Sequence, residues 1–465
     1  MNSIAKFFTL YWIIYFPTCI AFNDLPGFSI VDEVMTIILI GYTFMMKGHW
    51  DTNPKPWKEF YYFLLILTGY IIYSLIRRVN VVDAIWLELM QQIRPYSIIY
   101  CTWILNPRFT KTQKKWILTA MMATLGAWIY YHPIVTTAGV EAEFPVLGQL
   151  AICTGMAFYL FSEEKKQNTY IALALVLTGM LAPKFKFLGE VVCFVAIIFY
   201  LKEQLDFKSP KTVVYGTILM SAVLFVTWEK FDKYYITGFQ DTKYARPETY
   251  KTSLKILVDY IPFGPGMGTF GTNAAWRHYS TLYPKYGLNK VWGLDAGGGF
   301  ICDAFYPTLA QYGIVGVILF GIFWKRRLVA LNEIKDMRWY RIAFITFFCL
   351  AIEQTADSSW LSGKGMGYCM LIGLCLNANL NKQRDEEEEQ FEKEEEERLK
   401  RRRLEGMEEM RRDGNRRSAI TGDALLAKNL NVNENHYDNP NDNLNLNINK
   451  NDNNNQNEKG DVRHG

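Results

Sequence analysis

Apolar residues fill long stretches of the chain up to about Leu380 and become sparse beyond it. Each stretch runs for roughly 16–22 residues, close to the length that a helix needs to cross a bilayer. We therefore expect an all-α, polytopic integral membrane protein with about twelve transmembrane helices. Their expected ranges are 5–22, 28–46, 59–76, 84–104, 116–132, 146–162, 168–183, 186–201, 212–228, 302–324, 340–357 and 364–380. The seventh and eighth are separated by only a few residues around Pro183, so one long broken helix is an alternative.

Three segments depart from this pattern. Residues 229–301 combine glycines, aromatic rings and polar groups, which predicts one large functional loop within a membrane domain spanning 1–380. Residues 381–427 carry opposite charges three or four positions apart, as in a solvated helix that either docks a partner or is a plain extension. Residues 428–465 are rich in Asn and are expected to be disordered.

Lysine and arginine gather in alternate loops, which sets the expected orientation. The basic loops should be cytoplasmic, with both termini on that side and the 229–301 loop outside. The first apolar stretch has no small-residue cleavage site after it, so we expect a retained helix. The expected location is a bacterial inner membrane. A net charge of +4 gives no reason to expect a nucleic-acid partner.

Basic residues at membrane depth are the first candidates for chemistry, because burying a charge is costly. Arg94 lies near the middle of the fourth expected helix and must face an anion or a water-filled cavity. An internal ion pair with Glu88 or Glu353 is the alternative. Lys184 and Lys186 lie at an outer helix end, against the positive-inside trend, which favours a role for at least one of them in binding an anion such as pyrophosphate. For Lys184, extension of its side chain to the membrane interface is also an explanation.

Arg246 opens the large loop and completes a candidate anion site with Arg94 and Lys186. Guanidinium groups bind phosphate in a bidentate manner and lysine acts as a point charge. A cluster of this kind at a membrane surface would suit a lipid-linked pyrophosphate.

The loop itself supplies further candidates. Glycines in the segment 264–271 permit positive φ and close backbone approach, but the segment is neither a P-loop nor a dinucleotide fingerprint. A tight turn at the membrane surface is the plainer interpretation. The aromatic residues after it are candidates for stacking on sugar rings, or for building a loop core. The candidate glycan contacts are Gly264, Gly266, Gly268, Tyr279, Tyr283 and Trp292.

Candidates for acid–base catalysis are few. Asp303 enters a membrane helix from the outer side and is a candidate base, with an N-cap as the alternative. His278 in the loop is a second candidate, with a surface imidazole as the alternative. No group of His, Cys and Asp has metal-ligand spacing, so we expect neither a metal site nor a cofactor.

These loop residues resemble the O-antigen polymerase and O-antigen ligase superfamily, in its exopolysaccharide-polymerase branch. The resemblance is specific over about 70 residues and rests on Arg246, the segment 262–270, Tyr279 to Tyr283, Lys285 to Gly287, Phe300 to Asp303, and Gly313 to Gly316. The run 186–189 is similar to the basic motif of an earlier helix in that family. The tail lies outside the resemblance.

The resemblance implies a metal-independent glycosyltransferase that acts on a polyprenyl-pyrophosphate-linked glycan. Arg246 and Lys186 would contact the pyrophosphate and stabilise its developing charge. Many family members have a His-Asn pair where this chain has Cys302 and Asp303, which leaves the acceptor-activating group open. Polymerase is the preferred activity, with a chain-length regulator or flippase as possible partners. The alternatives are a ligase that transfers glycan to lipid or protein, and a polysaccharide or lipid transporter or flippase.

Overall fold

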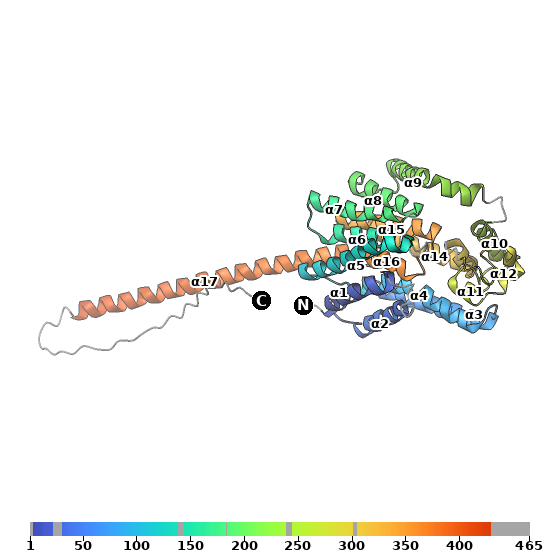
Figure 1. Ribbon diagram of the computed structural model, residues 1–465. Helices are drawn as coiled ribbons and strands as arrows, with labels where there is room; N and C mark the ends of the chain where they lie inside the picture. Colours follow the sequence, from blue (N-terminus) through green and yellow to red (C-terminus); the bar gives the residue numbers. More distant parts are fainter. Residues whose placement is uncertain are drawn as a thin grey trace, which may run out of the picture. The chain divides into compact units, whose positions relative to one another are not determined.

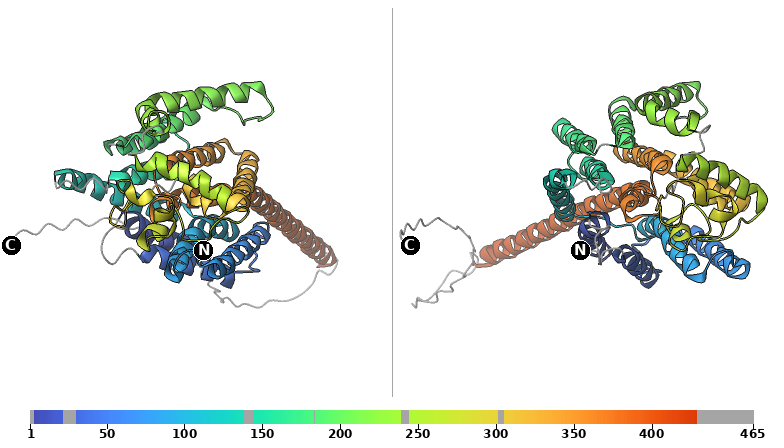
Figure 2. Two further views of the ribbon diagram at one scale, coloured as in Figure 1. Left: turned by 90° about the vertical axis from the view of Figure 1, so that its right-hand side faces the viewer. Right: turned by 45° about the vertical axis from the view of Figure 1, so that its right-hand side comes forward.

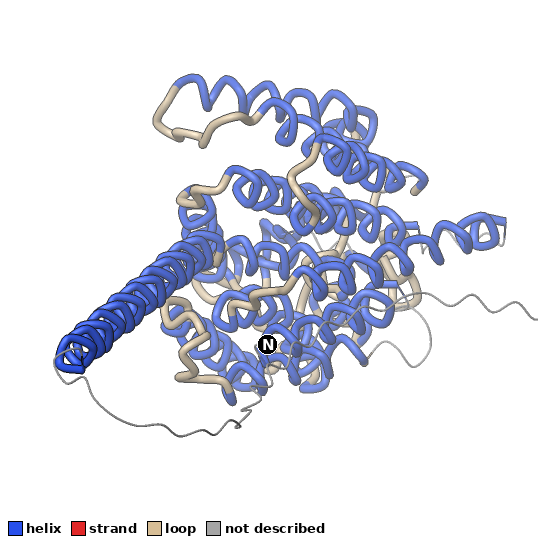
Figure 3. The backbone as a smooth tube through the Cα atoms, turned by 90° about the vertical axis from the view of Figure 1, so that its left-hand side faces the viewer, coloured by secondary structure: helices blue, strands red, loops and turns tan. Residues whose placement is uncertain are grey.

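The computed structural model describes residues 3–21, 30–137, 144–182, 184–238, 244–300 and 305–428. Within these ranges the chain is all-helical, with helices joined by turns and short loops and with no strand (Figure 3). The expectation of an all-α fold is therefore confirmed.

A helix occupies the place of each expected hydrophobic stretch. The tenth begins later than expected, at Gly313 rather than near 302, because Gly313 has a φ of +62° that ends the preceding turn. α7 and α8 are separate helices. The helices that correspond to the twelve ranges are α1 Ser3–Tyr15, continued by a π-helix over Phe16–Ala21, α2 Val31–Met45, α3 Trp57–Arg77, α4 Val82–Leu105, α5 Lys111–Thr137, α6 Phe144–Phe161, α7 Lys166–Thr178, α8 Phe185–Tyr200, α9 Pro210–Phe231, α14 Gly313–Asn332, α15 Met337–Ala356 and α16 Met366–Cys375.

The helices lie side by side (Figures 1 and 2), and the hydrophobic core is buried between them. α4 packs against α2, α3 and α16, and α6 packs against α5 and α7. α15 packs against α8 and α16, so the last helices of the bundle return to its centre. This arrangement brings the polar residues of α4, α8 and α15 into the interior.

Two of the described helices are long and apolar enough to cross a membrane, Trp57–Arg77 and Pro210–Glu229. The expected twelve-span topology is therefore not confirmed. The other helices are shorter or carry more polar groups. α4 is an example, because Glu88, Arg94 and two glutamines interrupt its apolar sequence.

The region expected as a large loop is folded. It holds a π-helix over Asp232–Ile236, the helices α10 Ala245–Asp259, α11 Asn273–Arg277 and α12 Leu282–Lys285, and a 3-10 turn over Leu288–Lys290. These short elements lie close together (Figure 2). They surround a small core of their own, formed in part by Phe270, Leu282 and Tyr283. α13 Phe305–Ala310 then leads to α14.

The chain divides into two compact units, Met1–Glu386 and Glu387–Gly465. The described part of the second unit is the remainder of α17, a helix that spans Ala378–Lys428. Ion pairs four positions apart support its exposed surface, among them Lys393 with Glu389 at 2.8 Å. The expected disordered segment from 428 onward lies almost entirely outside the described residues.

Candidate functional site

The segment from Glu353 to Leu361, at the end of α15, contacts all three residues of the expected anion site. Lys186 Nζ donates to Glu353 at 2.8 Å and to Asp357 at 2.7 Å. Arg246 donates to the carbonyl of Thr355 at 2.8 Å. Arg94 donates to the carbonyl of Leu361 at 3.1 Å. The structure therefore brings these basic residues to one short segment of the chain.

Carboxylates already compensate two of these charges. Arg94 lies 2.6 Å from Asp32 and 2.9 Å from Glu33, both on α2, rather than beside Glu88 or Glu353. The side chains of Arg94 and Lys186 are only 4% and 5% exposed. Each cation has two acidic partners within ion-pair distance, so both are poor sites for an additional anion.

The remaining expected residues of this group have simpler environments. Lys184 directly precedes α8 and is exposed. Arg246 is half-buried in the first turn of α10. Asp303 lies outside the described residues.

The glycine segment is a buried turn that fits between α3 and α4. Gly264, Gly266 and Gly268 all have positive φ, at +77°, +108° and +69°. A Cβ on Gly268 would meet the carbonyl oxygen of Ala84 at 2.6 Å, and one on Gly264 would meet that of Gln311 at 2.3 Å. These positions require glycine because the backbone conformation and the space exclude a side chain. The glycines therefore attach the loop to the helix bundle.

Glu88 reinforces this attachment from within the bundle. It is fully buried and accepts hydrogen bonds from Thr272 at 2.5 Å and from Gln311 at 2.9 Å. Gln92, one turn further along α4, donates to the same carboxylate at 2.8 Å. Glu88 thus joins the loop, α4 and the turn that precedes α14.

Most of the aromatic candidates build the loop core. Tyr279 stacks on Tyr283 at 5.5 Å between ring centroids, and Tyr283 is 2% exposed. Burial raises the pKa of Tyr279, with a further contribution from Asp295. Trp292, in contrast, is 83% exposed and accessible for stacking on a sugar ring. His278 is half-buried at the end of α11.

A polar pocket of about 570 Å³ lies where the last turn of α3 meets the loop. Its basic residues are Arg77 and Lys285, which lie 5.9 Å and 4.8 Å from the ring centre of Tyr260. Among the described residues, neither has a carboxylate within ion-pair distance, in contrast to Arg94 and Lys186. The complete lining is Tyr73, Arg77, Asp259, Tyr260, Ile261, Gly264 and Lys285.

Asp259 is the acidic residue of this pocket, and a tyrosine engages it. Tyr286 donates a hydrogen bond to Asp259 at 2.6 Å. Burial and this hydrogen bond raise the pKa of Tyr286, so its hydroxyl stays protonated and donates to Asp259. The pocket therefore has two basic side chains and one carboxylate, and neither basic side chain is within ion-pair distance of that carboxylate.

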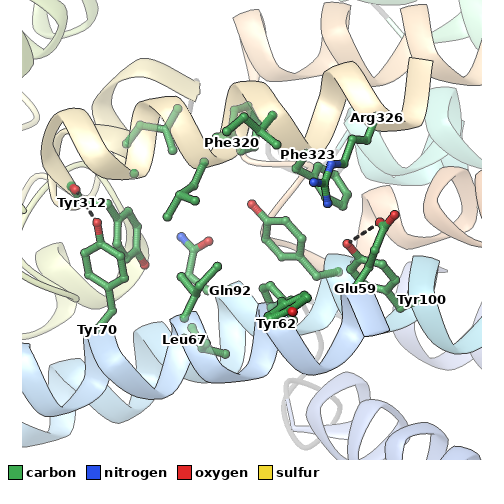
Figure 4. Close-up of a pocket in the computed structure, with 17 residues that line it drawn as sticks. Glu59, Tyr62, Leu67, Tyr70, Gln92, Tyr100, Tyr312, Phe320, Phe323 and Arg326 are labelled. Carbon is green, nitrogen blue, oxygen red and sulfur yellow. Dashed lines mark hydrogen bonds between the residues drawn. The ribbon is translucent and has the colours of Figure 1, made fainter. Parts of the chain in front are cut away.

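An apolar groove of about 360 Å³ runs along the same face of α3 toward its first turn (Figure 4). α3 contributes Glu59, Tyr62, Phe63, Ile66, Leu67 and Tyr70, at the spacing of one helix face. α14 forms the opposite wall with Phe320 and Phe323 (Figure 4). Ile66 and Ile322 are also exposed on the outer surface, at 39% and 43%, so the groove has a lateral opening.

The groove and the polar pocket lie in series along α3. Tyr70, which ends the groove, packs edge-on against Tyr73, which lines the pocket, at 6.5 Å between ring centroids. Such a sequence of apolar and cationic surfaces matches an amphiphile with an anionic head group. Arg94, Lys186 and Arg246 line neither cavity.

Sequence reasoning missed Arg77 as a site residue. Its signal was present, because Arg77 and Arg78 lie on the side expected to be poor in basic residues. Lys285 belongs to the segment that carries the family resemblance, although it was not singled out as a contact.

Within the described residues no group of three or more His, Cys, Asp and Glu side chains is arranged to hold a metal ion. No known protein-family model matches the chain, and no curated protein matches it either.

Proposed function

We propose that the chain is a membrane-embedded polysaccharide polymerase that joins glycan units carried on polyprenyl pyrophosphate. The apolar groove and cationic pocket in series along α3 carry this proposal, because a lipid-linked pyrophosphate has the same order of apolar and anionic parts. The proposed location is the outer face of a bacterial inner membrane. About twelve helices would cross the bilayer, with both termini cytoplasmic and the 229–301 loop outside.

Exposed apolar helix surfaces support membrane embedding. The span Pro210–Glu229 has none of its apolar window buried inside the protein. Phe225 and Met220 on this helix are 83% and 55% exposed. α3 likewise exposes Leu65 and Ile72, at 68% and 54%, on the surface away from its groove. A bare apolar surface of this extent is explained by contact with lipid.

The proposed reaction is a metal-independent glycosyl transfer. An acceptor hydroxyl forms a bond to the anomeric carbon as the bond from that carbon to the diphosphate oxygen breaks. The hydroxyl proton passes to a base, for which Asp303 and His278 remain the candidates and Asp259 is a third, in the cationic pocket. Arg77 and Lys285 would stabilise the charge on the leaving polyprenyl pyrophosphate. Arg246 remains a proposed contributor from the α15 side, whereas Lys186 is already ion-paired with Glu353 and Asp357.

Binding of polyprenyl pyrophosphate to purified full-length protein in nanodiscs tests the site. Arg77→Ala and Lys285→Ala should each weaken binding by about tenfold, because a charge-assisted hydrogen bond is lost. Arg78→Ala and Lys290→Ala are matched controls, since both residues are exposed and neither lines the pocket. Equal affinities for Arg77→Ala and Arg78→Ala would overturn the assignment of the pocket.

The groove is tested with the same binding measurement. Ile66→Trp should fill the groove and weaken binding of the lipid-linked ligand. Ile72→Trp is its control, because Ile72 is exposed on α3 and does not line the groove. A polymerisation assay with lipid-linked repeat units then tests the reaction. Binding without any polymer formed would refute polymerase activity while leaving the lipid site intact.

Two alternatives remain. A ligase would use the same donor site, and a gene deletion separates the two activities: loss of a polymerase leaves single repeats, whereas loss of a ligase leaves long chains on the carrier. A flippase or transporter is favoured by one observation, the two buried ion clusters around Arg94 and Lys186. Charged groups at membrane depth are common in transporters, which place them near the bilayer midplane.

A further inference from the structure

The apolar groove along α3 has charged residues of its own, at the end opposite the polar pocket. Glu59 in the first turn of α3 and Arg326 on α14 both line the groove there. Figure 4 shows the side chain of Arg326 extending from α14 into the groove, at the end that holds Glu59 and Tyr100 and away from Tyr70. A ligand in the groove would therefore meet a basic residue at this end as well.

The charge of Glu59 is compensated by a different arginine. Arg327, whose side chain is 1% exposed, forms an ion pair with Glu59. The guanidinium group of Arg327 also lies 4.6 Å from the ring centre of Trp103, which helps to hold it beside Glu59. Arg326 is exposed and has no carboxylate within ion-pair distance among the described residues. This end of the groove therefore has one cation more than it has carboxylates.

The lateral opening of the groove leads to this basic residue. Its edges are formed by Tyr62 and Ile66 on α3 and by Ile322 on α14, all of which line the groove and are exposed on the outer surface. Arg326 follows Ile322 by four positions, so the two residues share one face of α14. Residues 325–327 belong to a basic loop that the proposed topology places in the cytoplasm. The opening would therefore face the inner leaflet of the membrane, with Arg326 at the level of its head groups.

We propose that this end of the groove binds an anionic phospholipid of the inner leaflet, with its phosphate on Arg326 and one acyl chain in the groove. A guanidinium group binds phosphate strongly, and basic sites between helices on the cytoplasmic side suit anionic head groups. A zwitterionic lipid would bring a second cation to a place that already has an excess of positive charge. The acyl chain and the tail of the proposed carrier would occupy the same groove from opposite ends, so each excludes the other. The phospholipid site itself does not depend on polymerase activity.

Native mass spectrometry of the full-length protein in detergent tests the site. The probe is phosphatidylglycerol, and phosphatidylcholine with the same acyl chains is the reference, which should bind more weakly. Arg326→Ala should weaken binding of phosphatidylglycerol by about tenfold, because a charge-assisted hydrogen bond is lost. Lys325→Ala is the matched control, since Lys325 is the neighbouring exposed cation and does not line the groove. Ile66→Trp should also weaken binding, because the indole would fill the space of the acyl chain.

Arg77→Ala should leave binding of phosphatidylglycerol unchanged, so a failure of this site can be distinguished from a failure of the carrier site. Equal losses in Arg326→Ala and Lys325→Ala would overturn the proposal, by assigning the binding to surface charge alone. Displacement of phosphatidylglycerol by an equal concentration of glycerol phosphate would also overturn it, because the groove would then contribute nothing to the affinity.

Discussion

Lys186 shows how a buried charge contributes to stability in this chain. Its ammonium group bridges Glu353 and Asp357, and its side chain is 5% exposed. Lys186→Ala would leave two acidic groups without their cation, which should lower the free energy of unfolding by about 3–5 kcal/mol. Lys184→Ala is the matched control, because Lys184 lies two positions away and is exposed. Thermal unfolding in detergent measures both, and equal midpoints would contradict the assigned role.

Residue types were easier to predict than their partners. The sequence indicated that Arg94 needs an anion and offered an ion pair as the alternative to a ligand. The structure has an ion pair, but with Asp32 and Glu33 rather than with Glu88 or Glu353. The position of Arg94 along its helix indicates how deep the residue lies in the protein, but it does not indicate which helix supplies its partner. Glu88 was unavailable because it binds loop residues such as Thr272.

Among the elements, the glycine turn over residues 264–268, which packs against α3 and α4, gives the sharpest prediction. Gly268→Ala would place an alanine in the left-handed region of backbone conformation. Its Cβ would also lie only 2.6 Å from the carbonyl oxygen of Ala84 and would clash with it. Gly287 also has positive φ, but no atom lies within 4 Å of the position that a Cβ would take there. Gly287→Ala would therefore carry only the conformational cost of about 1–2 kcal/mol.

Gly268→Ala should accordingly lower the midpoint of thermal unfolding more than Gly287→Ala does. The opposite order would show that the turn is not packed against α4.

Helices were predictable because apolar stretches and polar breaks are local signals. The position of α14 was less predictable, since its start depends on the backbone conformation of Gly313 and on contacts with the segment at Pro262. The short helices of the loop have no apolar period of their own. They are held by contacts with the bundle, such as that of Met267 N with Ser74 Oγ at 2.8 Å, which no single stretch of sequence reveals.

For the molecule as a whole, the division after Glu386 predicts where the chain tolerates truncation. Removal of residues 387–465 should leave the thermal midpoint of the first unit unchanged. Truncation after Leu376 should destabilise it, because Asn377 is buried, donates to Thr102 at 3.2 Å and accepts from Asn53 at 3.1 Å. Comparing the expression levels and the thermal unfolding midpoints of the two truncated proteins measures the difference in stability. Equal stability of the two would show that Asn377 does not anchor this unit.

The arrangement of α3 has a consequence for any lipid that occupies it. From Glu59 in its first turn to Arg77 in its last, the helix extends for about 27 Å, with the groove over one part and the cationic pocket at the end. A head group bound at Arg77 would leave a fixed length of apolar groove for the lipid tail to fill. Each added segment of tail should tighten binding until the groove is filled, and longer tails should then gain nothing. α3 would in this way act as a molecular ruler for its carrier.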